Sequence, residues 1–285
     1  MERVRTVVIS GASTGIGAAC ALHLDRLGFV VFAGVRRAAD GEALKAKASP
    51  RLQPVVLDVT DAGTIEQARR LVVERVKDAG LDGLVNNAGI AVAGPLEAVP
   101  IPNLRLQFEV NVIGQVAVTQ AFLPLLRKGR GRIVNMGSIA GRAAMPLMGP
   151  YSASKFALEA LTDALRLEVQ QWGIHVSIVE PGAIATPIWE KSGAKAEELE
   201  TTTSGELKHL YAAVVAGVKA RVAEAAARAI PAEAVAQVVE HALTADRPKT
   251  RYLVGRDAKL RAIMVKLLPD RLSDRLMTKI LNLPH

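Results

Sequence analysis

The chain has 285 residues, of which 50% are hydrophobic and 22% charged, proportions typical of one globular domain and unlike those of a disordered chain. Its formal net charge is +8, but residues 247–285 carry ten Lys and Arg against three Asp, net +7, which leaves residues 1–246 at +1. This nearly neutral body gives no reason to expect nucleic-acid binding. The single cysteine, Cys20, excludes an internal disulfide, and the five scattered histidines predict no metal site.

Short apolar runs alternate with helical patterns along the chain. The runs are rich in β-branched residues and predict strands at 7–10, 30–33, 54–57, 83–86, 132–135, 175–179 and 251–254. Apolar residues at three-to-four spacing predict helices at 16–27, 63–78, 103–127, 150–171 and 231–245. We therefore expect an α/β fold, with a single doubly wound, Rossmann-like domain over residues 1–255 and helices on both faces of a parallel, about seven-stranded sheet.

Residues 187–230 interrupt this alternation with the turn-rich pieces SGAK and TTTSG, followed by an Ala-rich helix. An insertion after the sixth strand of such a sheet lies at its carboxyl edge, where ligands bind. We therefore expect this segment to border the substrate.

A glycine-rich loop, GASTGIG at 11–17, follows the first predicted strand and opens the first predicted helix. Glycines let the backbone approach a pyrophosphate, which then rests on the amide groups of a helix N-terminus. Three glycines alone are weak evidence, because tight turns also use glycine. The position between a strand and a helix favours nucleotide binding.

Together with later motifs, the GxxxGxG spacing resembles the short-chain dehydrogenase/reductase family over residues 4–254. The motifs occur in family order: SGASTGIG at 10–17, DVT at 58–60, NNAG at 86–89, Asn111, Ser138, YxxxK at 151–155, and PG at 181–182 before Thr186. Ser10 stands where the family usually has threonine, and keeps the hydroxyl. The resemblance implies an enzyme that moves a hydride between a nicotinamide cofactor and a CH–OH or C=O group.

Tyr151 and Lys155 are four residues apart, hence neighbours on one helix face. A free tyrosine has a pKa of about 10, too high for a base near neutrality. A lysine ammonium beside it is expected to lower the tyrosine pKa, so that Tyr151 can take or donate the proton of the substrate oxygen.

The resemblance implies a catalytic set of Asn111, Ser138, Tyr151 and Lys155, in which Ser138 and Tyr151 contact the substrate. Ser138 would stabilise the carbonyl oxygen. Lys155 would also hold the nicotinamide ribose, and Asn111 would orient a water that extends the proton relay.

The resemblance also implies where the cofactor lies. Asp58 would accept from the adenine amino group, although it also fits a turn or helix-cap residue in DVTDA. Asn87 to Gly89 would border the adenine ribose. Gly182 is expected to adopt an unusual backbone angle in a loop whose Ile184 backbone and Thr186 hydroxyl bind the carboxamide. The predicted cofactor-binding residues are Gly11, Ser13, Thr14, Gly15, Ile16, Gly17, Arg36, Arg37, Asp58, Val59, Asn87, Ala88, Gly89, Tyr151, Lys155, Pro181, Gly182, Ile184 and Thr186.

The end of the second strand predicts the cofactor type. NAD enzymes of this architecture place an acid there for the ribose hydroxyls, whereas this chain has Gly34 followed by Arg36 and Arg37. A guanidinium binds a 2′-phosphate through forked, charged hydrogen bonds. We expect NADP(H) to be preferred, with NAD(H) still possible and Arg36 as the main phosphate contact.

Substrate specificity is expected to lie in residues 90–100, 139–150 and 187–230. The apolar segment 139–150, with Met145 and Met148, suits a bulky apolar ligand, although methionines are also ordinary packing residues. VFAGVRR and this apolar loop extend the resemblance toward steroid- and retinoid-oxidising branches of the family. The predicted substrate is a lipophilic alcohol or ketone: a sterol, a retinoid or a long-chain carbonyl.

Residues 256–285 form a basic, amphipathic helical extension. Its apolar stripe runs through Leu260, Ile263, Met264, Leu267 and Leu268, and continues after Pro269. The stripe could lie on an anionic membrane, cover the active-site opening or contact a second subunit. These three alternatives stay open.

Two function classes remain. An oxidoreductase is favoured by the acid–base tyrosine, and the alternative is a non-catalytic nucleotide-binding scaffold or sensor. The segment before Val7 predicts no signal peptide, and no uncharged apolar stretch reaches about 18 residues. We expect a cytoplasmic homodimer or homotetramer, with membrane association left open.

Overall fold

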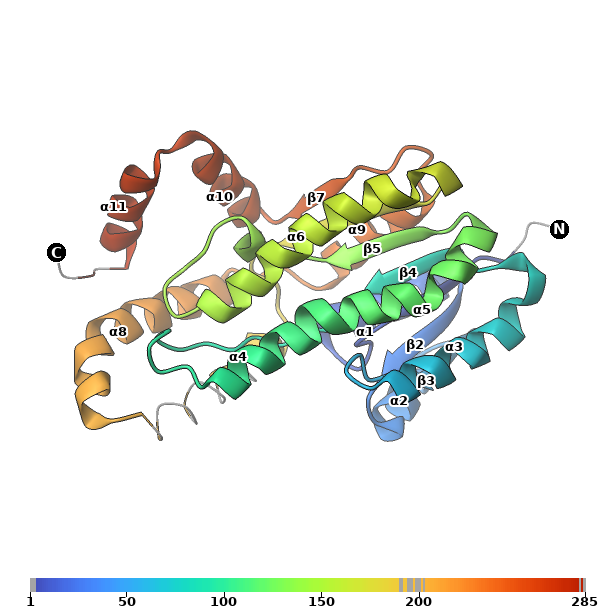
Figure 1. Cartoon of the computed structure of the whole chain (residues 1–285), viewed down its shortest axis with the longest axis horizontal. Helices are drawn as coiled ribbons and strands as arrows, with labels where there is room; N and C mark the ends of the chain where they lie inside the picture. Colours follow the sequence, from blue (N-terminus) through green and yellow to red (C-terminus); the bar gives the residue numbers. More distant parts are fainter. Residues whose placement is uncertain are drawn as a thin grey trace.

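The computed structural model describes residues 4–189, 192–193, 197, 201, 203–281 and 283. Within them a parallel sheet of seven strands forms the centre, in the order β3-β2-β1-β4-β5-β6-β7 (Figure 1). The strands are β1 (Thr6–Ile9), β2 (Val30–Val35), β3 (Leu52–Val56), β4 (Gly83–Asn86), β5 (Arg132–Met136), β6 (His175–Pro181) and β7 (Arg251–Val254). The order reverses between β1 and β4, which creates the crevice in which doubly wound folds bind ligands.

Helices cover both faces of the sheet. They are α1 (Gly15–Arg26), α2 (Ala38–Lys45), α3 (Ala62–Val76), α4 (Ile101–Phe108), α5 (Gly114–Gly129), α6 (Gly149–Val169), α8 (Gly205–Ala227), α9 (Glu233–Thr244), α10 (Arg256–Leu267) and α11 (Asp270–Ile280). Short 3-10 turns occupy Lys77–Ala79, Ile139–Gly141 and Gln170–Trp172. The predicted α/β class is confirmed.

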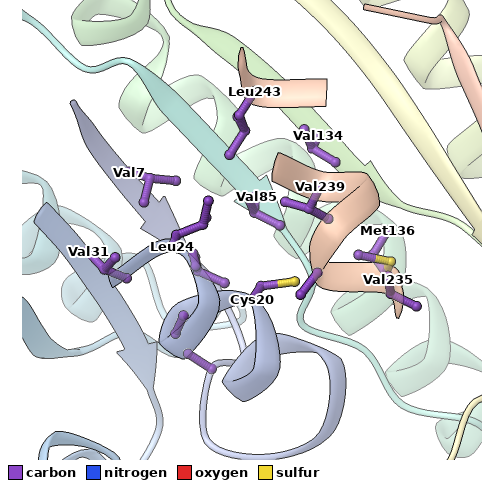
Figure 2. Packing of buried hydrophobic residues seen from close by; sticks show 14 of the residues in the cluster. Val7, Cys20, Leu24, Val31, Val85, Val134, Met136, Val235, Val239 and Leu243 are labelled. Atoms are coloured by element: carbon purple, nitrogen blue, oxygen red, sulfur yellow. The ribbon is translucent and has the colours of Figure 1, made fainter. Parts of the chain in front are cut away.

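The sheet separates two apolar cores, which explains its continuous apolar strands. In β1, Val7 and Ile9 face the core beneath α1 and α9, whereas Val8 faces the core beneath α3 and α5. Successive side chains of a strand point to opposite faces, so a strand covered on both sides is apolar throughout. Figure 2 shows the first of these cores, where α1 and α9 meet over the sheet.

Cys20 lies in this core, fully buried, and burial raises the pKa of its thiol to about 12. Cys20 therefore packs as a small buried hydrophobe.

The sequence patterns miss two local features. The predicted helix 103–127 is interrupted by a π-helical segment, Glu109–Ile113, between α4 and α5. Helix α2 was not predicted, because its eight residues bury only Gly41 and Leu44 and so leave little periodicity. Of segment 187–230, residues 190, 191, 194–196, 198–200 and 202 lie outside the described residues, and so does part of each turn-rich piece.

The helical stretch Ile101–Gly129 has the length and apolar composition of a membrane span, the one such stretch in the described part of the chain. Half of its most apolar window is buried inside the protein. Val118, Phe122 and Leu126 are fully buried in the core beneath α5. These contacts identify it as a core helix of the domain.

The C-terminal helix α10 docks on the domain through small residues. Ala258 and Ala262 are buried against Ile139 and Leu253. The predicted stripe instead faces outward, with Leu260, Ile263 and Leu267 exposed by 60%, 55% and 70%. Of the three alternatives left open for this stripe, packing over the domain's own active-site opening does not fit these three exposed residues of α10. The membrane and the second subunit stay open as contacts.

Candidate active site

The glycine loop between β1 and α1 is shaped by close backbone contacts. Gly11 and Gly15 have φ values of +66° and +56°, a region that side chains other than glycine rarely adopt. A Cβ at Gly17 would lie 2.2 Å from the Gly11 carbonyl oxygen, and a Cβ at Gly11 2.7 Å from Ala88 Cα. Glycine is therefore required by both conformation and space.

Ser10 and Asn87 hold this loop against the end of β4. Ser10 Oγ accepts hydrogen bonds from the backbone amides of Asn87 and Ala88, at 3.0 and 3.1 Å. Asn87 Nδ2 donates to the carbonyl oxygens of Ser10 and Gly11, at 3.1 and 3.0 Å. The serine hydroxyl thus accepts the bonds that fix the loop, which explains why a hydroxyl residue suffices at position 10.

The loop and helix start fit a dinucleotide pyrophosphate. Thr14 precedes α1 in an extended conformation without a side-chain cap, and the first turn carries no acidic residue. The first amides of a helix are unpaired within it and favour an anion. A Cβ at Gly15 would lie 3.1 Å from Thr186 Cβ, so the glycine loop and the loop after β6 meet here. The residues Ser13, Ile16 and Gly17 complete this predicted cradle.

Asp58 follows β3 and makes local bonds. Its Oδ1 accepts from the backbone amide and the hydroxyl of Thr60, at 3.0 and 2.8 Å. Asp58 therefore stabilises a turn, which is one of the two roles considered for it from the sequence. Val59 beside it is buried, and its carbonyl oxygen lies 2.7 Å from the position of a Cβ at Gly114, which brings α5 close to this turn.

The two arginines that follow the end of β2, Arg36 and Arg37, differ in their contacts. A Cβ at Gly34 would lie 2.8 Å from Leu57 Cδ2, so the residue that follows β3 crowds the position where NAD enzymes carry an acid. Arg37 is held by Asp40, with its Nε and Nη2 at 3.0 and 2.8 Å from the two carboxylate oxygens. Arg36 is exposed, and no ion pair with a described residue engages it.

Ser138 and Tyr151 meet at the carboxyl end of β5. Burial raises the pKa of Tyr151, and the interaction with the Ser138 side chain lowers it by less, so that the net direction is upward. The prediction that Lys155 lowers this pKa is wrong for the cofactor-free protein. The Lys155 ammonium lies 5.7 Å from the tyrosine ring centroid and donates instead to the Met136 carbonyl oxygen, at 2.6 Å.

Lys155 is itself strongly perturbed. Its side chain is buried, and this burial lowers its pKa from 10.5 to about 8, while the charge of Glu159 acts in the opposite direction. Buried ammonium groups lose hydration that only close partners replace. A buried lysine with a pKa perturbed in this way is a candidate for a functional residue.

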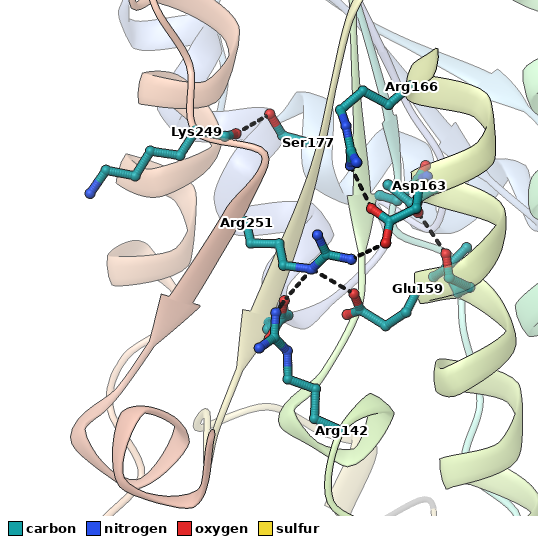
Figure 3. A network of polar contacts seen from close by, with 11 residues as sticks. Arg142, Glu159, Asp163, Arg166, Ser177, Lys249 and Arg251 are labelled. Atoms are coloured by element: carbon teal, nitrogen blue, oxygen red, sulfur yellow. Dashed lines mark hydrogen bonds and ion pairs between the residues drawn. The ribbon is translucent and has the colours of Figure 1, made fainter. Parts of the chain in front are cut away.

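A polar network lies one helical turn beyond Lys155 (Figure 3). Arg251 of β7 contacts Glu159 at 3.2 Å and Asp163, both on α6. Arg142 Nη2 donates to Glu180 Oε1 at 2.9 Å. Burial and the charge of Glu180 raise the pKa of Glu159 to about 7. The network ties β6, β7 and α6 together behind the lysine.

Asn111 sits in the π-helical segment and is fully buried. Its Oδ1 accepts from the Ile90 amide at 2.9 Å, and its Nδ2 donates to the Ile90 carbonyl at 3.0 Å and to Ser154 Oγ at 3.1 Å. Ser154 Oγ in turn donates to the Tyr151 carbonyl oxygen at 2.7 Å. Asn111 therefore links the loop after Gly89 to the helix that carries Tyr151.

The loop after β6 corrects the expectation for Gly182. Its φ is not in the positive region, so no unusual backbone angle explains the glycine. Space explains it: a Cβ there would lie 2.1 Å from Asp257 Oδ2. Ile184 is buried and pairs with Ile230, and the Trp189 indole donates to the Ile184 carbonyl oxygen at 2.9 Å.

The three segments expected to border the substrate contact one another. Gly94 N donates to Leu147 O at 2.8 Å, which joins 90–100 to 139–150. Tyr211 of α8 donates to Glu97 at 2.8 Å. Leu147 adopts a φ of +65°, a strained backbone typical of functional sites. Met145, Pro146, Leu147 and Met148 are half-buried beside Tyr151.

Three residues of the site were not singled out from the sequence. Ser154 and Gln107 belong to the bonds around Ile90, and Gln107 Oε1 accepts from the Val92 amide at 2.7 Å. Ser154 could have been found three positions after Tyr151 on one helix face. Asp257 carries no such signal, because its partner, Ala183, lies 74 residues away in the sequence. Within the described residues, no cluster of His, Cys, Asp and Glu suits a metal ion.

Comparison with known proteins places this architecture in a family. The family described as short chain dehydrogenase matches residues 5–197. The chain belongs to the short-chain dehydrogenase family. The predicted resemblance is thereby confirmed, and with it the prediction of a nicotinamide-dependent oxidoreductase.

Similar short-chain dehydrogenases extend over nearly the whole chain. Retinol dehydrogenase 5 of Mus musculus is 39% identical and covers 98% of this chain and 89% of its own length. The NADPH-dependent 3-dehydrocapnine reductase of Ornithobacterium rhinotracheale is 36% identical, with 98% of both chains covered. A crystal structure of a short chain dehydrogenase from Burkholderia cenocepacia in complex with NADP is 27% identical, with a TM-score of 0.73 and 99% of both chains covered.

Proposed function

We propose that this short-chain dehydrogenase interconverts a lipophilic alcohol and its ketone or aldehyde with NADP(H), with Tyr151 as the proton donor and acceptor. The observation that carries the proposal is the pair of Tyr151 and Ser138 at the carboxyl edge of the sheet. The Ser138 side chain lies close enough to Tyr151 to act on its pKa, and burial raises that pKa by more than Ser138 lowers it. At neutral pH the phenol is therefore protonated, the form that reduction of a carbonyl requires.

Each residue has a defined part in the proposed reaction. The bound NADPH supplies the hydride. Ser138 donates a hydrogen bond to the substrate oxygen and stabilises its developing charge. Tyr151 delivers its proton to that oxygen. Lys155 holds the nicotinamide ribose and, as an ammonium, stabilises the phenolate left behind, while Asn111 fixes the helix of Tyr151 from the side of Ile90.

The lipophilic substrate is supported by the apolar segment around Met145 and Met148 and by the relative named retinol dehydrogenase 5. The proposal is tested by initial rates of NADPH and NADH oxidation against ketones and aldehydes that range from small polar compounds to steroids and retinal. Selective turnover of the apolar compounds with NADPH is expected. Turnover confined to small polar carbonyls would contradict the substrate class.

NADP preference follows from the guanidinium at the end of β2. Replacing Arg36 by Ala is expected to raise the KM for NADPH roughly 10- to 100-fold and to leave the KM for NADH within about twofold, because a charge-assisted phosphate contact is worth about 1.5–3 kcal/mol. Arg37→Ala is the matched control, since Asp40 already engages that guanidinium. Equal small effects of Arg36→Ala on both cofactors would contradict the assignment.

A homodimer or homotetramer is proposed from the exposed apolar residues of the long helices. Leu106 of α4, Ile113 at the end of the π-helical segment, and Phe156 and Leu167 of α6 are exposed by 44%, 52%, 45% and 67%. Apolar area of this kind on a domain surface favours contact with a second copy. Cytoplasmic location remains part of the proposal.

Peripheral contact with an anionic membrane is proposed for α10 and α11. The outward apolar residues Leu260, Ile263 and Leu267 lie beside the exposed cations Lys259 and Lys266. Such a face combines apolar insertion with attraction to anionic lipid.

Replacing Leu260, Ile263 and Leu267 together by Ser is expected to lower sedimentation with vesicles of 30% anionic lipid at least about fivefold, because burial of each side chain contributes roughly 1.5–3 kcal/mol. Leu71→Ser on α3 removes an exposed leucine outside α10 and α11 and is the control. Equal sedimentation of both variants and the wild type would rule out this face as the contact.

A further inference from the structure

We propose that Asp257, in the first turn of α10, positions the loop Pro181–Thr186 for the nicotinamide, so that α10 is part of the active-site support. The inference rests on the proposed function, in which this loop holds the cofactor. Asp257 touches the loop rather than any reacting atom, and is therefore a positioning residue.

The Asp257 carboxylate occupies a space that two glycines leave open. Its Oδ2 accepts a hydrogen bond from the Ala183 amide at 2.8 Å. A Cβ at Gly182 would lie 2.1 and 2.3 Å from the two carboxylate oxygens, and a Cβ at Gly255 2.4 Å from Oδ1. Side chains at either position would displace the carboxylate, so the motif glycine at 182 serves the contact with α10.

The same loop is held by backbone bonds on its other sides. Gly182 N donates to Val254 O at 2.9 Å, and Ala185 N donates to Ile230 O at 2.9 Å. Between these two anchors, the Ala183 amide is bound by a carboxylate. Bonds to a charged acceptor are stronger than those between neutral groups. Asp257 thus fixes the segment that lies between the strand end and Ile184.

Helix α10 also contacts the loop that carries Ser138. One turn after Asp257, Arg261 Nη2 donates to the Ala143 carbonyl oxygen at 3.3 Å. Ala258 and Ala262 are buried against Ile139, the residue after Ser138. Helix α10 therefore contacts both the loop proposed to hold the nicotinamide and the loop that carries Ser138. In the proposed reaction the hydride passes from the cofactor to the substrate that these two loops hold. Small changes in their separation alter the rate steeply, because the reacting atoms must be aligned.

Full-length Asp257→Ala is expected to raise the Kd for NADPH and to lower kcat, each roughly tenfold, because the loop loses its central anchor. The deuterium isotope effect on kcat with 4-deuterated NADPH should rise, since hydride transfer becomes more limiting. Asp257→Asn keeps an acceptor oxygen and should stay within about threefold of the wild type. Asp270→Ala removes the corresponding acid of α11 and is the matched control.

A double-mutant cycle tests whether the Asp257 carboxylate is the reason that position 182 is a glycine. Gly182→Ala is expected to weaken NADPH binding at least about threefold more in the wild type than in Asp257→Ala, because the second background has room for the methyl group. Equal losses in both backgrounds would overturn the contact as the reason for the glycine.

The outcomes separate this inference from the proposed function. A wild type that neither binds NADPH nor reduces any carbonyl would overturn the proposed function, and the inference with it. An active wild type whose Asp257→Ala variant has a lower Tm but unchanged Kd, kcat and isotope effect per folded molecule would overturn the inference alone.

Discussion

Replacement of Tyr151 by Phe is expected to lower turnover with NADPH about 10³-fold while the Kd for NADPH stays within about threefold. The variant keeps the half-buried ring on α6 and removes only the hydroxyl, whose pKa the Ser138 side chain affects. Loss of a positioned proton donor typically lowers the rate 10²- to 10⁴-fold. Stopped-flow single turnovers give the rate of the chemical step, and quenching of protein fluorescence gives the Kd.

Tyr252→Phe is the control, because it also removes a tyrosine hydroxyl from the domain. Tyr252 lies on β7, and its hydroxyl is bonded to His241 Nδ1 at 2.9 Å. The turnover of Tyr252→Phe per folded molecule should match the wild type. If Tyr151→Phe also kept wild-type turnover, another group would have to supply the proton. That result would refute the role of Tyr151.

Lys155→Met is expected to lower turnover at least about 10²-fold and yet to stabilise the cofactor-free protein at pH 7. Burial lowers the pKa of Lys155 from 10.5 to about 8. An unfolded lysine keeps its proton up to about pH 10.4. Between these pKa values the unfolded chain binds more protons than the folded one, so stability rises with pH there.

Below about pH 8 the folded protein bears the full cost of the buried charge, which corresponds to roughly 3 kcal/mol for this pKa difference. Loss of the bond to Met136 O offsets about 1 kcal/mol of the gain. Urea unfolding should therefore show Lys155→Met more stable by about 2 kcal/mol at pH 7, with the gain shrinking from about pH 8 toward 10.5.

Lys128→Met is the matched control, because that lysine is half-exposed and pairs with the exposed Asp78. Lys128→Met should leave the free energy of unfolding nearly unchanged at pH 7 and also near pH 10.5. A Lys155→Met protein that is less stable than the wild type at pH 7 would contradict the account of Lys155 as a residue kept for chemistry.

Local sequence patterns were sufficient where one element or one motif decides the structure. The strands are read correctly because both faces of β1, through Val7 and Val8, are buried. The glycine loop could be placed because a strand precedes it and a helix follows it. The positions of Ser138 and Tyr151 follow from the same order of elements, and in the structure the Ser138 side chain acts on the pKa of Tyr151.

The features that the sequence did not predict depend on contacts between distant segments. Asp257 lies beside Gly182 only in the folded chain. The sequence alone therefore suggested that a glycine is needed at position 182 for its backbone angle rather than for space. The pKa of Tyr151 depends on burial, which the spacing to Lys155 does not reveal. The π-helical segment holds Asn111, whose side-chain amide bonds Ile90, a contact between distant segments that no periodicity contains.

The central claim is that this chain transfers a hydride from NADPH to a carbonyl through a site served by Tyr151. The most direct measurement is mass spectrometry of the alcohol formed from retinal or a steroid ketone with 4-deuterated NADPH. The account predicts one deuterium on the carbinol carbon with the wild type and no labelled alcohol above background with Tyr151→Phe. Tight NADPH binding without label in any alcohol of the carbonyl panel would contradict it and favour a nucleotide-binding scaffold.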